Sequence, residues 1–295
     1  MKRFDIFNEQ VRQIAIVGTG LIGASLGLAL RGINYPGRII GVGRRQSTVD
    51  RALALGCMDD GSTELGKTVV ESQLVVLATP FQTTTGLLEH LAPCDHPDLV
   101  ITDVGSTKQH ICSAAERTLP EPGRFVGSHP MAGSEKQGPE HAQARLFDAK
   151  PCVITPLEHS TEEALTRVRA LWTMLGMHLI EMSPVEHDRK TACISHLPHA
   201  LACQLVALAA KKQALGVAST GFRDITRVAS GDPELWQQIF TSNRQEVVAA
   251  LDAFLEELKA FRAKLASNDD ERLLEQLRFS KQERDEWIRR IRAKT

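Results

Sequence analysis

The pattern of hydrophobic and polar positions divides the chain near residue 182. Before this point, short apolar runs alternate with longer amphipathic segments, which is typical of consecutive βα units. The runs predict strands at Ile14–Val17, Arg38–Val42, Leu74–Leu77, Leu99–Thr102, Arg124–Val126, Cys152–Ile154 and His178–Glu181. The segments between them predict helices such as Ala24–Arg31, Thr48–Leu55, Gln109–Thr118 and Glu162–Leu175. We therefore expect an α/β fold with a Rossmann-type, mostly parallel sheet covered by helices.

Helical periodicity replaces this pattern after Ser183-Pro184, and no further strand is predicted. From residue 247 onward, apolar positions recur at steps of three and four residues and predict one buried stripe: Val247, Val248, Leu251, Phe254, Leu255, Leu258, Phe261 and Leu265. We expect two domains, an α/β domain over residues 1–182 and an all-helical domain over 183–295 that helps to form a dimer.

Composition and charge exclude several classes of protein. The 35 basic and 36 acidic residues balance, so no net field attracts the chain to nucleic acid or to an anionic membrane. The six cysteines are scattered without a Cys-x-x-Cys pair, which indicates reduced thiols in a cytoplasmic protein. Residues 1–10 lack the apolar core of a signal peptide. The uncharged stretch 14–30 is slightly short for a membrane span and is interrupted by glycines, so we expect no membrane contact.

A glycine-rich loop, Gly18-Thr19-Gly20-Leu21-Ile22-Gly23, joins the first predicted strand to the first helix. Gly18 permits a tight turn, Gly20 allows close approach of a pyrophosphate, and Gly23 lets helix and strand pack closely. The free N–H groups at the helix N-terminus favour a phosphate. A plain strand-to-helix turn is the alternative, but the strand–turn–helix context favours dinucleotide binding.

The second predicted strand bears on which dinucleotide is bound. An acidic residue about 20 positions after the loop would bond the ribose 2′-OH of NAD, whereas this chain has Arg44 and Arg45 there and no carboxylate before Asp50. Two guanidinium groups favour the 2′-phosphate of NADP over NAD; the alternative is that they are solvated loop residues. Ser47 in the same turn and Thr79, just after the strand 74–77, complete the expected cofactor-binding set.

Two polar segments follow the next strands and should face one crevice, because ligands of open α/β sheets bind beyond the carboxyl ends of the strands. They are Asp103–Lys108 and Gly127–Glu135. The imidazole of His129, with an ordinary pKa near 6.5, can accept a proton from a substrate hydroxyl, and Ser106 can bond the same hydroxyl. The alternatives are that Ser106 or Asp103 caps the following helix and that His129 is structural.

The helical half adds His196-Leu197-Pro198-His199 and Gly221-Phe222-Arg223-Asp224-Ile225-Thr226-Arg227. No cysteine or carboxylate supports the histidines at a metal-ligand spacing, so no metal is expected. Arg223 or Arg227 can anchor an acidic substrate. An ion pair with Asp224 is the alternative.

Taken in order, these motifs resemble those of the prephenate/arogenate dehydrogenase family of tyrosine biosynthesis over nearly the whole length. The glycine loop is generic, whereas four later motifs are specific: Asp103–Lys108, Gly127–Gly133, Ser195–His199 and Gly221–Arg227. The resemblance implies a dinucleotide-binding domain over 1–182 and a helical substrate-binding and dimerisation domain over 183–295. It further implies oxidative decarboxylation of a cyclohexadienol, with hydride transfer to NADP or NAD, in a homodimer.

The resemblance also implies roles for individual residues. His129 would deprotonate the ring hydroxyl with the help of Ser106, while His199 would bind the substrate and Arg227 its ring carboxylate. Glu135, Arg223 and Asp224 match a polar group at the mouth of the site; Arg223 replaces a lysine of some relatives. Trp236 resembles an aromatic residue that reaches the partner subunit's site, with core packing as its alternative.

The substrate is expected to be prephenate, converted to 4-hydroxyphenylpyruvate, with arogenate or dual cyclohexadienyl specificity as the alternative. Cyanobacterial NADP-dependent arogenate enzymes resemble this chain around Arg44–Thr48 but lack a histidine at the position of His199. Two other hypotheses are a 3-hydroxyacid dehydrogenase and a catalytically silent NADP-binding assembly protein. The serine and histidine motifs argue against the 3-hydroxyacid dehydrogenase.

Overall fold

The computed structural model describes residues 7–134 and 136–292 and separates into two compact units. The first extends to Asn243 and the second begins at Arg244. The sequence-based domain boundary at 182/183 therefore lies inside the first unit and stays a prediction.

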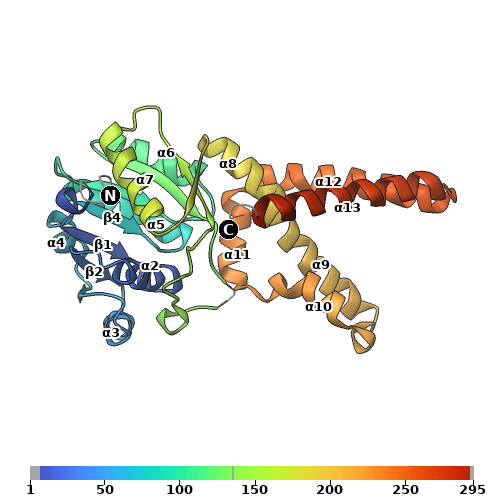
Figure 1. Ribbon diagram of the computed structural model, residues 1–295, viewed down its shortest axis with the longest axis horizontal. Helices are drawn as coiled ribbons and strands as arrows, with labels where there is room; N and C mark the ends of the chain where they lie inside the picture. The colour runs from blue at the N-terminus through green and yellow to red at the C-terminus, as the bar shows by residue number, and fades with distance from the viewer. Residues whose placement is uncertain (1–6, 135, 293–295) are drawn as a thin grey trace. The chain divides into compact units, whose positions relative to one another are not determined.

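The first unit is built around one eight-stranded sheet (Figure 1) in the order β3-β2-β1-β4-β5-β6-β7-β8. The strands are β1 Gln13–Val17, β2 Arg38–Val42, β3 Asp60–Ser62, β4 Leu74–Leu77, β5 Val100–Asp103, β6 Phe125–Pro130, β7 Pro151–Thr155 and β8 His178–Glu181. All neighbouring strands pair in parallel except β6 and β7. The expected mostly parallel, Rossmann-type sheet is confirmed, and its order reverses between β1 and β4, where such sheets bind ligands.

Two hydrophobic cores lie on opposite faces of this sheet, because successive strand side chains point to opposite sides. Ile14 and Ile16 pack in one core with residues of α2 and α7, and Ala15 and Val17 pack in the other with residues of α5 and α6. The helices that connect the strands are α2 Leu21–Gly32, α3 Gln46–Ala54, α4 Leu65–Val70, α5 Phe81–Leu91, α6 Gln109–Thr118 and α7 Glu162–Met174. Short 3₁₀ turns occupy Ala92–Cys94, Pro122–Arg124 and Pro139–His141.

Two strands differ from the sequence-based expectation by more than one residue at an end. Strand β3 was not predicted, because its three residues, Asp-Gly-Ser, carry no apolar side chain. Strand β6 runs to Pro130 rather than ending at Val126. The sequence placed His129 in a loop, which is wrong: pairing of Gly127–Pro130 with β7 extends the strand through it.

The rest of the first unit is helical, with no further strand among its described residues. It comprises α8 Pro184–Thr191, a π-helical turn Ala192–His196, α9 Leu197–Lys211, α10 Thr220–Thr226 and α11 Pro233–Ser242, with 3₁₀ turns at Leu215–Val217 and Arg227–Ser230. The continuous helical stretch Pro184–Lys211 is long and apolar enough to cross a bilayer by length and composition, a test that helices of soluble proteins also pass.

The second unit is a pair of long helices, α12 Arg244–Ala266 and α13 Asp270–Arg292. The expected buried stripe on α12 is wrong for the single chain: Val247 is buried, but Val248, Leu255, Leu258 and Leu265 are about half exposed. A pair of helices has too few neighbours to cover both apolar faces. Leu274, Leu277 and Phe279 of α13 are also exposed.

Candidate active site

A cavity of about 650 Å³ opens at the carboxyl ends of the central strands. Its walls come from the segments that follow β1, β4 and β5, from the end of β6 and its loop, and from the helical part: Gly20–Ile22, Ala78–Phe81, Val104–Thr107, His129–Ser134, Lys136–Gly138, Lys150, Ser195, Asp232, Leu235, Trp236, Gln238 and Ile239. The volume is typical of sites for small molecules and cofactors. All of these residues belong to the first compact unit.

The glycine loop forms the part of the wall that fits a pyrophosphate. Gly18 has φ of +107°, and a Cβ there would lie 2.3 Å from the carbonyl oxygen of Ala78; a Cβ at Gly23 would lie 1.9 Å from the carbonyl oxygen of Gly18. A Cβ at Gly20 would meet nothing within 4 Å, so this residue faces open space. Gly20, the N-cap residue of α2, has no side chain that could cap the first N–H groups of the helix. The loop therefore offers main-chain donors and room for a phosphate.

The other predicted cofactor residues divide into two groups. Leu21, Ile22 and Thr79 line the cavity. Thr19 is buried instead, and its Oγ1 lies near Gly43 of the turn that follows β2.

Arg44, Arg45 and Ser47 are exposed in the turn that follows β2 and do not line the cavity. The main-chain N–H of Gly18 donates to the carbonyl of Val42 at 2.7 Å, which places the end of β2 beside the glycine loop. The arginines thus follow a strand end that adjoins the predicted pyrophosphate site.

His129 and Ser106 both line the cavity, as expected from two strand ends that share one edge of the sheet. His129 lies near the end of β6, opposite Val153 of β7. Burial is the largest cause that lowers the pKa of His129 well below its usual range, and His187, Lys108 and His196 lower it further. The imidazole is therefore neutral at neutral pH and can accept a proton.

The structure adds two neighbours of His129 that the sequence did not single out. Nδ1 of His129 lies 2.9 Å from Nε2 of His187, and Nδ1 of His187 lies 2.7 Å from Oδ1 of Asp188. Both residues are buried on α8. His187 and Asp188 were missed because a His-Asp pair within a charged helical turn is typical of a solvent-exposed helix face.

Asp188 also holds the start of α6. Its Oδ1 accepts from the main-chain N–H of Lys108 at 2.7 Å and its Oδ2 from that of Gln109 at 2.9 Å. The alternative that Asp103 or Ser106 caps this helix is therefore wrong, since an acidic residue from the helical part of the unit supplies the cap.

Asp103 instead forms a fully buried ion pair with Lys108. Lys108 Nζ also donates to the carbonyl of Ser128 at 3.0 Å, and the N–H of Ser128 donates to Asp103 Oδ1 at 3.2 Å. The hydroxyl of Ser128 bonds the carbonyl of Asp103 at 2.5 Å and accepts from Trp172 Nε1 at 3.0 Å. This network joins β5 to β6 at Ser128, the residue before His129.

His199 is buried and stacks on Trp236, with ring centroids 3.5 Å apart. Trp236 lines the cavity of its own chain, whereas His199 lies behind it and is not among the lining residues. Ser195, which the sequence analysis included in a family motif but gave no role, lines the cavity from the π-helical turn.

The predicted carboxylate-binding segment does not reach the cavity. Arg223 pairs with Asp224 at 3.2 Å, with both side chains largely exposed, as the alternative interpretation of this motif expected. Arg227 is exposed at the start of the 3₁₀ turn Arg227–Ser230. Among the described residues of the cavity wall, the lysines are Lys136 and Lys150 and the one carboxylate is Asp232.

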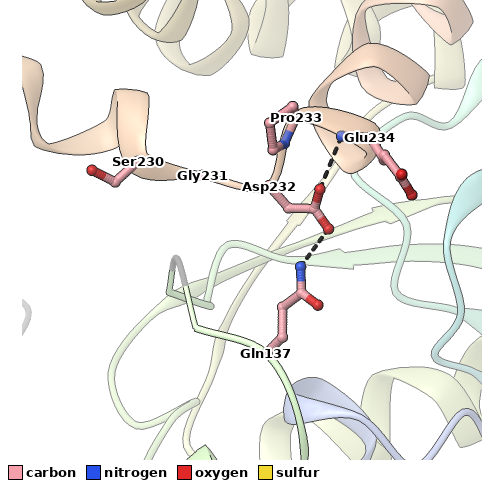
Figure 2. Close-up of a pocket in the computed structure, with 6 residues that line it drawn as sticks. All are labelled: Gln137, Ser230, Gly231, Asp232, Pro233 and Glu234. Carbon is pink, nitrogen blue, oxygen red and sulfur yellow. Dashed lines mark hydrogen bonds between the residues drawn. The ribbon is translucent and has the colours of Figure 1, made fainter.

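The loop after β6 is tied to the start of α11. Figure 2 shows Gln137 donating to Asp232, whose other carboxylate oxygen accepts from the N–H of Glu234 at 2.9 Å. Both Gln137 and Asp232 also border a second, open cavity of about 630 Å³. Glu135, the remaining predicted residue of this loop, lies outside the described residues. Among the described residues, no cluster of three metal-ligating side chains is present.

Comparison with known proteins gives matches along nearly the whole chain. The profile of the nucleotide-binding domain of prephenate dehydrogenase matches residues 26–181, and that of its dimerization domain matches residues 183–279. Prephenate dehydrogenase of Bacillus subtilis is 37% identical over 286 residues, covering 94% of this chain and 76% of the relative.

Two solved structures share the fold closely. Prephenate dehydrogenase from Aquifex aeolicus, in complex with hydroxyphenyl propionate and NAD+, has a TM-score of 0.88 and 31% identity and covers 93% of this chain and 98% of its own. Arogenate dehydrogenase of Synechocystis has a TM-score of 0.82 and 33% identity and covers 93% and 99%. With both domain profiles matched in order, the chain belongs to the prephenate dehydrogenase family.

Proposed function

We propose that the protein catalyses the NADP-dependent oxidative decarboxylation of prephenate to 4-hydroxyphenylpyruvate. The observation that carries this proposal is the position of His129, a neutral imidazole in the wall of a cavity that also holds the N-terminus of α2. Family membership supplies the reaction class, and the relatives named prephenate dehydrogenase support the substrate.

His129 accepts the proton of the ring hydroxyl at Nε2, the ring nitrogen that does not face His187. Ser106, in the same wall, bonds this hydroxyl and orients it. A dinucleotide held by the glycine loop would supply the nicotinamide that takes the hydride from the carbinol carbon. The chain needs no further acid, because loss of CO2 from the opposite ring carbon sends an electron pair to the oxygen, and the proton on His129 can return to the phenolate formed.

The remaining substrate contacts follow the family resemblance. We assign the ring carboxylate to Arg227 and a further substrate contact to His199, which supports Trp236 from behind. Glu135, Arg223 and Asp224 are assigned to the mouth of the site. Trp236 already lines the cavity of its own chain, and a second role in the partner's site is part of this proposal.

NADP is the proposed cofactor, because the turn after β2 presents two exposed guanidinium groups where NAD-binding folds present a carboxylate. The protein is proposed to act as a cytoplasmic homodimer, with the exposed apolar side chains of α12 and α13 as part of the interface.

The test is production of NADPH with prephenate and, separately, with arogenate, by the parent and by His129→Asn. We expect turnover with prephenate and a loss of about two decades or more in kcat for the variant, since the proton acceptor is removed. Preference for arogenate would transfer the assignment to that substrate, in line with the Synechocystis neighbour. Absence of turnover with either substrate would favour a silent binding protein, and equal rates in parent and variant would remove His129 from its role.

A further inference from the structure

The hydrogen-bond chain behind His129 defines which of its nitrogens carries a proton. Both oxygens of Asp188 already accept from main-chain N–H groups, those of Lys108 and Gln109. Asp188 is therefore an acceptor toward His187 as well, so the proton of neutral His187 lies on Nδ1. Its Nε2 is then an acceptor.

The position of the proton on His187 also determines the position of the proton on His129. Nε2 of His187 faces Nδ1 of His129 at 2.9 Å, and a bond between two neutral rings needs one donor, which must be Nδ1–H of His129. Nε2 of His129 is then unprotonated. We propose, on the basis of the proposed function, that His187, oriented by Asp188, is a positioning residue that fixes His129 in the tautomer whose free Nε2 accepts the substrate proton.

Several observations separate this role from simple packing. His187 is fully buried and does not line the cavity, so it acts on the substrate only through His129. The charged and titratable groups around it are His129, Asp188 on its own helix, Lys108 and Asp103 of the β5–α6 connection, and His196 of the π-helical turn. His187 is neutral at neutral pH, since burial lowers its pKa despite the opposing effect of Asp188.

The two main-chain hydrogen bonds to Asp188 fix the position of its carboxylate and therefore of the His187 ring. They fasten the carboxylate to the N-terminus of α6, which begins beside the segment that carries Ser106. The carboxylate of Asp188 is thus linked both to His129, through His187, and to the helix that follows Ser106. An unconstrained imidazole samples both neutral tautomers, and one of them presents N–H rather than a lone pair to the hydroxyl.

The first measurement is the ¹⁵N NMR signature of the imidazole rings in the parent without substrate, which reports the tautomer independently of any activity. We expect His129 and His187 both protonated at Nδ1. Protonation of His129 at Nε2 in the parent would overturn the proposal without bearing on the reaction catalysed.

The second measurement compares His187→Leu with His187→Gln. Leucine removes the acceptor, so we expect His129 to shift toward the Nε2–H tautomer and kcat to fall by about 10–100-fold, with KM for the substrate changed far less. Glutamine can accept from Nδ1–H through its amide oxygen and should restore the parental tautomer and most of kcat. Parental kcat and tautomer in His187→Leu, or failure of glutamine to rescue, would contradict the proposal.

Thr191→Val is the matched control. Thr191 is buried one turn further along α8, and its hydroxyl donates to the main-chain carbonyls of His187 at 2.9 Å and Asp188 at 3.2 Å rather than to a ring. We expect lower stability but an unchanged tautomer. NADP binding and thermal unfolding check that each variant is folded; if His187→Leu does not fold, His187→Met replaces it. An inactive parent with the expected tautomer would reject the proposed function and leave the inferred proton position standing.

Discussion

The buried polar groups around His129 and the exposed arginines of the turn after β2 and of α10 are organised in opposite ways. Asp103, Lys108, His187 and Asp188 are all nearly inaccessible to solvent, and each bonds a neighbour from another segment of the chain. Arg44, Arg45 and Arg223 are exposed, and the ion pair of Arg223 is with its sequence neighbour.

The difference indicates that folding of one chain sets up the proposed proton acceptor, whereas the proposed anion-binding groups would acquire their function only when a ligand binds. A buried charge without a partner is costly, so the first region must be complete in the fold itself. An exposed guanidinium is stabilised by water in the absence of a ligand and can later bind a phosphate or carboxylate. The two regions should therefore respond differently to mutation.

The largest effect is expected for Lys108→Met. The change leaves the buried carboxylate of Asp103 without its cation, and we expect the free energy of unfolding to fall by on the order of 3–5 kcal/mol, measured by chemical denaturation. Arg223→Ala, which removes an exposed pair, should change it by less than about 1 kcal/mol. Similar losses in both variants would contradict the contrast between the regions.

The second-largest effect is expected from acidification, which should lower the free energy of unfolding through the buried histidines. The folded-state pKa of His196 is lowered from 6.5 to about 4, chiefly by burial. The unfolded chain then binds more protons below pH 6.5, so this stabilisation is present above pH 6.5 and is lost as the pH falls toward 4, on the order of 3 kcal/mol. Lowered pKa values of His129 and His187 act in the same direction.

Denaturant unfolding at a series of pH values measures this loss. His196→Gln removes the titrating ring and should flatten the dependence on pH, whereas the same exchange at exposed His178 should leave it as in the parent. A parental slope in His196→Gln would show that His196 is not responsible.

For the exposed region, Arg227→Ala should raise KM for the substrate by about 10–100-fold and leave stability close to that of the parent, because one charge-assisted bond to a carboxylate is lost. Steady-state kinetics measure this directly. Arg223→Ala is the control and should have the smaller effect, because Arg223 is assigned to the mouth of the site rather than to the ring carboxylate. Equal KM values in parent and Arg227→Ala would remove Arg227 from substrate binding.

The smallest effect is expected for the double variant Arg44→Ala and Arg45→Ala. Loss of exposed pairing to the 2′-phosphate should lower kcat/KM for NADP by about tenfold, with the value for NAD changed little. The comparison of the two cofactors in the parent and the double variant is the measurement. An unchanged NADP preference would rule out the guanidinium explanation.

Local patterns in the sequence predict the elements of the fold well where each element has an apolar face of its own. Strand β8 and helix α6 have the predicted bounds, and the glycine loop follows β1 as expected. Strand β3 was missed because its residues are polar and its position depends on pairing with β2. The end of β6 was missed because pairing with β7, twenty residues later in the chain, decides it.

The candidate site divides in the same manner. Ser106 and His129 could be placed together from strand order alone, because parallel strands end at one edge. His187 and Asp188 could not, since the bond of His187 to His129 and those of Asp188 to the start of α6 depend on how α8 packs against α6 and β7. No local spacing encodes that packing. Nor does spacing reveal that Arg227 is exposed and outside the cavity wall of the single chain.

The π-helical turn at Ala192–His196 determines which residues of one long helix share a side. In a regular α-helix, His187 and Ser195 would be about 80° apart around the axis, at about 100° per residue. A wider i→i+5 turn absorbs much of that offset. The turn holds one residue more than regular winding would need, so a one-residue deletion within it should leave Ser195 on nearly its present side, about 20° from His187. A one-residue deletion in α8 after His187, outside the turn, would instead rotate Ser195, with all of α9, by about 100°. The spacing between these two motifs is therefore as much a determinant of the site as their residues.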